Sequence, residues 1–140
     1  MPYVMKIRAG VVAITCLLAA AAPAFAFELA GIWYGRGQPD DPDVVSLVEL
    51  KADGTFRSEF RKYDKCKLLW RQTETGTWTA EGASQHFVVQ TVDDRPVHID
   101  EFYTTDMLSN TEQHVRLADE AFMFMEHRVA AFEFPDCLTS

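Results

Sequence analysis

The residues best able to do chemistry in this sequence are four histidines: His86, His98, His114 and His127. No two of them show a His-x-His or His-x-x-x-His spacing, so a metal site would have to be assembled from different strands. Four unrelated surface or half-buried histidines are the simpler interpretation. We therefore expect no metal centre and no cofactor.

The run Glu126-His127-Arg128 places three ionisable residues in an otherwise apolar segment. Successive residues of a strand face opposite sides, so Glu126 and Arg128 share one face and His127 takes the other. If the shared face points inward, both charges need partners, because buried charges are costly unless paired. Glu74 is a candidate partner for Arg128. Such a pair is either a structural ion pair or a polar anchor for the head group of a ligand.

Motifs typical of enzymes are absent from the sequence. It contains no serine nucleophile elbow, no Cys-His pair and no glycine-rich phosphate loop. A closed sheet could bring two of Glu74, Asp106 and Glu126 together as a carboxylate pair, but nothing in their spacing singles them out. The sequence therefore predicts a protein that is not an enzyme.

The elements that must position these residues are short β-strands. Runs rich in Val, Phe, Tyr, Trp and Thr alternate with turn residues about every 10–14 positions, which is typical of an antiparallel all-β domain. The predicted strands span residues 32–36, 44–51, 55–63, 69–80, 85–92, 99–108, 112–117 and 122–132, with a polar loop at 38–43. Eight strands joined by short connections predict a single up-and-down meander barrel, with a two-layer sandwich as the alternative.

The predicted strand 69–80 shows the clearest alternation of faces. Trp70, Gln72, Glu74, Gly76 and Trp78 fall on one face, and the opposite face is mostly threonine. A threonine-lined face is a solvated sheet surface, so the tryptophan face is expected to point inward. The aromatic residues expected inside the barrel are Phe56, Phe60, Trp70, Trp78 and Phe102. They either fill the interior or line a pocket for an apolar or aromatic ligand.

Composition indicates one globular domain and excludes some classes of partner. The chain has 140 residues, of which 48% are hydrophobic, with a mean hydropathy of -0.10. Thirteen Lys and Arg stand against 21 Asp and Glu, which gives a net charge of -8. This acidic balance opposes phosphate backbones, so nucleic acid is not an expected partner.

The first 26 residues are typical of a secretory signal peptide. Lys6 and Arg8 precede an apolar stretch at 9–22, and Ala24-Phe25-Ala26 is a small-x-small cleavage site. The apolar stretch is shorter than the roughly 20 residues that span a bilayer. We expect cleavage after Ala26, an exported (periplasmic or secreted) domain at 27–140 without an integral membrane segment, and a monomer. Cleavage removes 2 of the 13 basic residues and none of the 21 acidic ones, so the net charge becomes -10.

Two cysteines, Cys66 and Cys137, follow the predicted cleavage site. In an oxidising compartment they predict one disulfide, with two free thiols or a metal pair as the alternatives. A bridge would close a loop of about 70 residues, worth roughly 4 kcal/mol on the loop-entropy estimate.

The segment Leu29-Ala30-Gly31-Ile32-Trp33-Tyr34-Gly35 contains a Gly-x-Trp motif at the start of the predicted barrel. With the eight-strand meander, it resembles the lipocalin or calycin families, and more narrowly the small lipocalin-like domains of exported bacterial proteins. The resemblance implies that Trp33, after Gly31, packs across the closed end of the barrel with Arg128 against it. It also implies that a Cys66–Cys137 disulfide ties the C-terminal segment to the barrel wall.

The same segment, extended to Gly37, is similar to the Gly-x-Trp-x-Gly-x-Gly opening of nitrobindin-type haem barrels. That resemblance implies haem binding with His127 as the iron ligand. It is a minor alternative.

The leading functional hypothesis is non-catalytic binding of a small apolar or amphipathic molecule inside the barrel. The expected ligand-binding residues are Phe56, Phe60, Trp70, Glu74, Trp78, Phe102 and Arg128. The alternative is a protein-interaction or inhibitor module with a filled barrel and no ligand. An interior void of about 300 Å³ or more would favour the first hypothesis.

Overall fold

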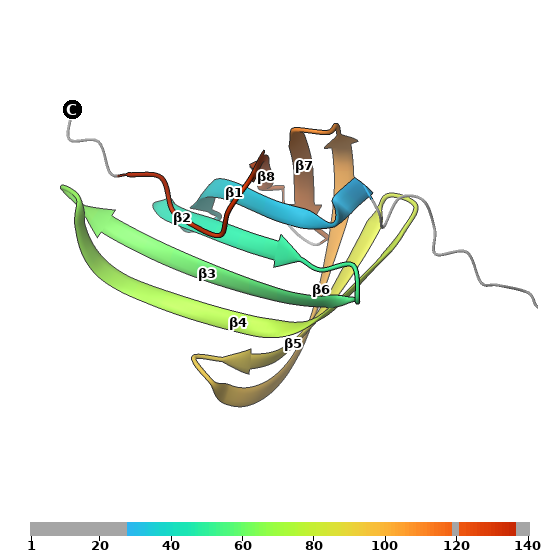
Figure 1. Cartoon of the computed structure of the whole chain (residues 1–140), viewed down its shortest axis with the longest axis horizontal. Helices are drawn as coiled ribbons and strands as arrows, with labels where there is room; N and C mark the ends of the chain where they lie inside the picture. Colours follow the sequence, from blue (N-terminus) through green and yellow to red (C-terminus); the bar gives the residue numbers. More distant parts are fainter. Residues whose placement is uncertain (1–27, 119–120, 137–140) are drawn as a thin grey trace, which may run out of the picture.

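The computed structural model describes residues 28–118 and 121–136, and within them the chain forms one closed antiparallel barrel (Figure 1). Each strand pairs with the next along the chain, and β8 closes the barrel on β1 through pairs such as Trp33–Arg128 and Gly35–Glu126. The strands are β1 (Gly31–Gln38), β2 (Asp41–Leu50), β3 (Thr55–Asp64), β4 (Lys67–Glu81), β5 (Ser84–Val92), β6 (Arg95–Leu108), β7 (Glu112–Leu117) and β8 (Met123–Val129). The predicted eight-strand meander barrel is confirmed, and the sandwich is excluded.

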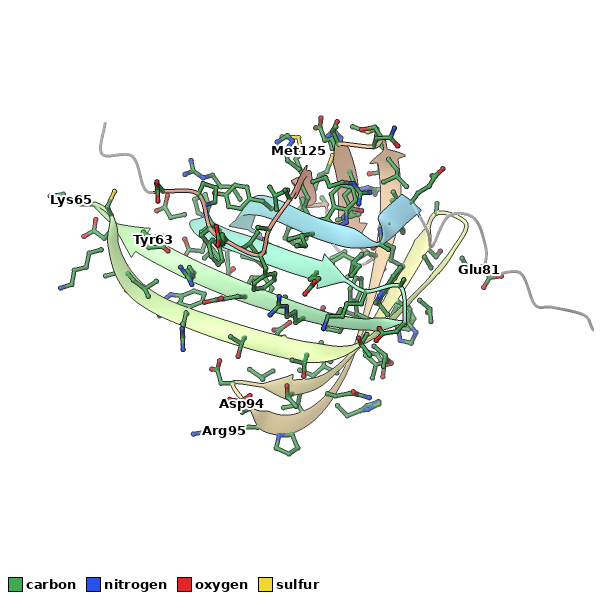
Figure 2. All side chains as sticks on the ribbon, in the orientation of Figure 1. Tyr63, Lys65, Glu81, Asp94, Arg95 and Met125 are labelled. Carbon is green, nitrogen blue, oxygen red and sulfur yellow. The ribbon has the colours of Figure 1, made fainter. Side chains whose placement is uncertain are left out.

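Most strands extend further than predicted because the turns between them are tight. The polar loop expected at 38–43 is only a turn at Pro39 and Asp40, and β2 already begins at Asp41. At the far end of the β3–β4 hairpin, Lys65 and Cys66 both have positive φ angles, of 45° and 64°. Figure 2 places Lys65 at the tip of this long hairpin.

The chain beyond β8 departs from the prediction. A strand was expected to run to residue 132, but β8 ends at Val129, and residues 130–136, here called the C-terminal strap, cross the outside of the barrel (Figure 1). The guanidinium carbon of Arg57 lies 4.1 Å from the ring centroid of Phe132, and that of Arg61 lies 4.2 Å from the ring centroid of Phe134. The strap therefore packs along the outer face of β3.

One end of the barrel is filled by a core built around two tryptophans. The core residues are Leu29, Trp33, Leu50, Phe56, Trp78, Ala80, Phe87 and Val89. The indole N–H of Trp33 donates to the Leu29 carbonyl at 2.9 Å, and that of Trp78 to the Lys51 carbonyl at 3.0 Å. Both rings are thus buried with their only donor satisfied, which is the usual requirement for tryptophan in a core.

Arg128 covers the same end from outside. Its guanidinium carbon lies 4.3 Å from the centroid of Trp33, and its nitrogens donate to the carbonyls of Ala30 (2.7 Å), Asn110 (2.8 Å) and Glu28. Gly31 has a φ of +146°, and a Cβ there would lie 2.2 Å from the Arg128 Nη1 atom. A side chain here would be strained by its φ and would displace the Arg128 guanidinium, so glycine suits the position. Trp33 and Arg128, which the family resemblance places together, are in contact here.

Two predictions fall outside the described residues. The signal peptide and its cleavage after Ala26 lie in residues 1–27, and Cys137, the expected partner of Cys66, lies in residues 137–140. In the part of the chain that the structure describes, no helix has the length and hydrophobicity needed to cross a membrane.

Candidate ligand cavity

A cavity of about 460 Å³ lies inside the barrel, and the turn between β1 and β2 contributes to its rim. Its apolar lining is Val44, Val48, Leu50, Phe56, Phe60, Trp70, Phe87, Tyr103, Val115 and Phe124. Its polar lining is Gln38, Asp40, Asp41, Ser46, Ser58, Gln72, Glu74, Gln85, Glu101, Gln113 and Glu126. Half of the wall is therefore aromatic or aliphatic, and the other half consists of carboxyl, amide and hydroxyl groups.

The aromatic part of the wall changes from buried to exposed along β3 and β4. Phe56 is 5% exposed and packs edge-on against Phe87 at 5.0 Å between ring centroids, so it joins the core to the cavity. Phe60 is half-buried, and Trp70 is 42% exposed. All three line the cavity, as expected from the alternation of their strands.

Glu126 is the most deeply buried acid of the cavity, at 9% exposure. The amide nitrogen of Gln113 donates to its Oε2 atom at 2.6 Å, and the amide nitrogen of Gln85 donates to Gln113 (3.3 Å) and to Thr105 (2.8 Å). Burial raises the pKa of Glu126 to about 7, although the hydrogen bond from Gln113 opposes this shift. Gly35 makes room for it, because a Cβ there would lie 3.1 Å from the Glu126 Cγ atom.

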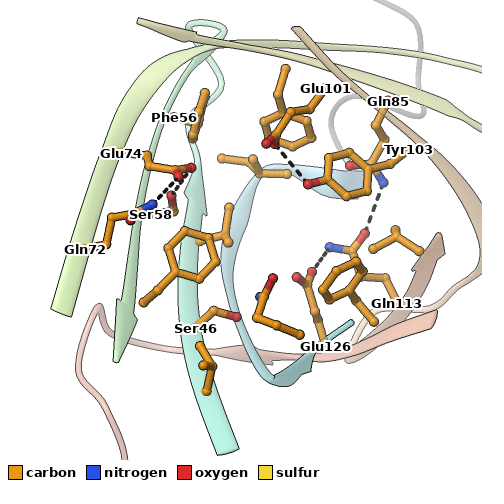
Figure 3. A pocket seen from close by; sticks show the side chains of 18 of the residues that line it. Ser46, Phe56, Ser58, Gln72, Glu74, Gln85, Glu101, Tyr103, Gln113 and Glu126 are labelled. Atoms are coloured by element: carbon orange, nitrogen blue, oxygen red, sulfur yellow. Dashed lines mark hydrogen bonds between the residues drawn. The ribbon is translucent and has the colours of Figure 1, made fainter. Parts of the chain in front are cut away.

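Two more carboxyl groups face the cavity from other strands, as Figure 3 shows. Glu74 accepts hydrogen bonds from Gln72 (2.9 Å) and Ser58 (3.5 Å), and Glu101 accepts one from the Tyr103 hydroxyl (3.0 Å). Burial, followed by the charge of Glu101, raises the pKa of Glu74. Burial also raises the pKa of Tyr103. The negative charges of Glu101, Glu126 and Glu74 raise it further, because all three carboxyl groups act on the phenol.

Two aromatic residues expected in the site lie elsewhere. Trp78 is on the predicted face but at the filled end, where it belongs to the core and not to the cavity wall. The inward orientation expected for Phe102 is wrong. Phe102 is 53% exposed, and its ring stacks on His86 at 4.3 Å between centroids, outside the barrel. The neighbouring Tyr103 takes the inward position.

Arg128 and His127 also depart from the expected sites. Arg128 binds main-chain carbonyls at the filled end and is not part of the cavity wall, so the expected pair with Glu74 is not formed. Glu126 faces the cavity, and His127 therefore lies on the outside of β8, where it is exposed. Met125, on the same outer face, is 55% exposed (Figure 2). A haem inside the barrel would not meet His127.

Four residues that line the cavity were not predicted from the sequence: Gln85, Glu101, Tyr103 and Gln113. A signal existed for two of them. Gln85 alternates with Phe87 and Val89 on the inner face of β5, and Gln113 alternates with Val115 on β7. A polar residue in register with buried apolar ones indicates a buried polar group that needs a partner.

Comparison of the chain with models of known protein families gives no match, and comparison with curated proteins gives none either. The described residues contain no group of three or more His, Cys, Asp or Glu side chains placed to hold a metal ion. The cavity can therefore be described only by its own chemistry. It offers apolar contact on aromatic walls and hydrogen-bond acceptors on carboxyl groups, of which that of Glu126 is buried.

Proposed function

We propose that this chain is an exported, monomeric, lipocalin-like barrel that binds a small amphipathic molecule in its cavity and does not catalyse a reaction. The observation that carries the proposal is the cavity itself. Its volume of about 460 Å³ lies within the range of roughly 300–1,000 Å³ typical of small-molecule sites. Aromatic side chains and a few convergent polar groups are the usual lining of such a site.

The contrast between the ends of the barrel supports a lipocalin-like assignment. Trp33 and Arg128 seal one end over Gly31, while the other end keeps a cavity with a half-exposed tryptophan, Trp70. A barrel with one sealed end and one open end suits the uptake of a small molecule from solution. A protein-interaction module with a filled barrel does not require a void of this size.

The path of the C-terminal strap supports a disulfide that fixes it to the barrel. Phe132 packs on Arg57, and Phe134 packs on Arg61, which is four residues nearer to the turn that carries Cys66. From Phe132 to Phe134 the strap therefore runs along β3 toward the turn that carries Cys66. We include the Cys66–Cys137 bridge in the proposal because an exported protein would meet an oxidising compartment.

The test is a fluorescence titration with the neutral aromatic probe N-phenyl-1-naphthylamine. We expect enhanced probe emission with the wild-type barrel and a loss of affinity of about tenfold or more in Ser46→Trp, because an indole would occupy the cavity. The control is Thr75→Trp, which adds the same group on the outer face of β4. Thermal unfolding of both variants checks that they fold. The proposal is wrong if the wild type does not bind the probe, or if folded Ser46→Trp binds it equally well.

A further inference from the structure

Every ionisable group that could carry a full charge at the cavity wall is an acid. Glu74, Glu101 and Glu126 lie inside it, and Asp40 and Asp41 lie at its rim. Among the described residues that line it there is no lysine, arginine or histidine. The ammonium group of Lys62 is 2.6 Å from Asp41, so this acid at the rim has a basic partner. The three glutamates of the interior have none among the described residues.

The three interior carboxyl groups are held by neutral donors. Glu126 is bound by the Gln113 amide, Glu74 by an amide and a hydroxyl, and Glu101 by the Tyr103 phenol. In the described part of the chain none of the three forms an ion pair with a basic side chain. Figure 3 shows them facing the cavity from different sides, with Glu126 beside Gln113 and Glu74 beside Ser58.

This arrangement is costly when no positive charge faces the carboxyl groups. Buried carboxylates without a cation lose solvation, and like charges that share a site oppose one another's ionisation. The raised pKa of Glu74, caused by burial and then by Glu101, is one sign of that cost. A stabilising core would place apolar residues here. A ligand that supplies a positive charge would offset this cost.

The Glu126 carboxyl group is the best placed to meet that charge. Its Oε2 atom is bound by Gln113, while its Oε1 atom has no hydrogen bond to any residue in 28–118 or 121–136. The Gln85 amide nitrogen donates to the Gln113 amide oxygen, which orients the Gln113 amide nitrogen toward Glu126. The Glu126 carboxyl group therefore accepts this hydrogen bond. The walls nearby are aromatic, with Tyr103 and Phe124 packed edge-on at 6.2 Å. Aromatic faces attract organic cations, most strongly where water is excluded.

We propose that the ligand of the cavity is an organic cation, an amine with an aromatic or aliphatic body, whose ammonium group binds the carboxylate of Glu126. This inference rests on the proposed function, since it names the class of molecule that the same cavity takes. An organic cation is favoured over a metal ion because the three carboxyl groups do not form a metal-binding cluster. The body of the molecule lies against the aromatic wall.

The test uses three naphthalene probes whose one-carbon substituent is cationic, neutral or anionic: 1-naphthylmethylamine, 1-naphthalenemethanol and 1-naphthoic acid. Titration calorimetry at about pH 8 and low salt should give an amine affinity at least about tenfold above that of the alcohol, equivalent to roughly 1.4 kcal/mol, and no binding of the acid. Glu126→Gln should lower the amine affinity to near that of the alcohol and leave the alcohol unchanged. Glu133→Gln, an exposed acid of the strap, is the matched control and should change nothing.

The outcomes separate this inference from the proposed function. If none of the three probes binds, the small-molecule function itself is contradicted. If the alcohol and the amine bind equally and Glu126→Gln affects neither, the barrel binds small molecules but the cationic ligand is wrong. Calcium chloride, titrated as a fourth ligand, should not bind, and binding that Glu126→Gln abolishes would replace the amine by a metal ion.

Discussion

The two ends of this barrel are built from opposite kinds of contact. At the filled end Leu29 and Trp33 are fully buried, and the indole and guanidinium donors there all reach main-chain carbonyls. At the cavity end the buried Glu126 and the half-buried Glu74 and Glu101 lie without a basic partner among the described residues. The filled end therefore contributes stability, and the cavity end gives some of it up, which is the pattern expected of a binding site.

The difference in stability between the two ends is tested most strongly by replacing one tryptophan at each end. Trp33→Ala should lower the free energy of unfolding by about 3–5 kcal/mol, because it empties a fully buried site. Trp70→Ala should cost less than about 1 kcal/mol, because the ring is 42% exposed. Urea unfolding measures both. Equal losses would show that the two ends do not differ in the way described.

The proposed disulfide should add stability at the tip of the β3–β4 hairpin. Reduction, or the double substitution Cys66→Ser and Cys137→Ser, should lower the free energy of unfolding by up to roughly 4 kcal/mol, because the unfolded chain loses a closed loop. Mass spectrometry of unreduced, digested protein should find the two cysteines in one linked peptide. Recovery of both cysteines as free thiols from freshly purified protein would contradict the proposed Cys66–Cys137 bridge.

The cost at the cavity end should depend on pH through Glu126. Its pKa in the folded barrel is about 7, against 4.5 for an ordinary glutamate, so the protonated form favours the folded state. The contribution is complete below about pH 4.5 and is lost as the pH rises through 7. Glu126→Gln should therefore be more stable than the wild type at about pH 8, by up to about 3 kcal/mol at 1.36 kcal/mol per pKa unit.

Urea unfolding at about pH 4 and pH 8 measures this difference. The two proteins should have nearly equal stability at the lower pH, since a protonated carboxyl group and an amide are both neutral. Glu133→Gln is again the control and should track the wild type at both values. A Glu126→Gln variant that is less stable at about pH 8 would mean that the carboxylate stabilises the fold.

A smaller effect is expected from the glycine under Arg128. Gly31→Ala should cost about 1–3 kcal/mol, because the new Cβ meets the Arg128 Nη1 atom at 2.2 Å and φ is +146°. Gly82→Ala is the matched control. Gly82 also has a positive φ, of +57°, but nothing lies within 4 Å of its Cβ position, so it should cost about 1 kcal/mol. Thermal unfolding compares the two, and equal costs would show that the contact with Arg128 adds no penalty at Gly31.

The barrel was predictable from sequence because strand periodicity and turn residues are local signals. The faces of β4 followed directly from its alternation, which put Trp70, Glu74 and Trp78 on one side. Periodicity does not encode position along the barrel axis, however. Trp78 at the filled end and Trp70 at the cavity therefore received the same expected role, and Arg128 was assigned to the interior although it lies beyond it.

The orientation of β6 could not be read from its sequence. Its inner face carries Glu101, Tyr103 and Thr105, so it is nearly as polar as the outer face with Asp100 and Phe102. A wall that lines a polar cavity weakens the contrast between inside and outside on which the prediction depends. The prediction was therefore wrong for β6, at a part of the cavity wall where polar side chains stand on both faces of the strand.

The central claim is that the cavity holds a small molecule, and native mass spectrometry tests it most directly. The full-length chain is expressed in its own cells and purified without denaturation, as the wild type and as the Ser46→Trp and Thr75→Trp variants. We expect a bound molecule of constant mass in the wild type and in Thr75→Trp, and none in Ser46→Trp. A wild-type barrel whose mass equals that of the processed chain alone, with no added mass, would contradict it.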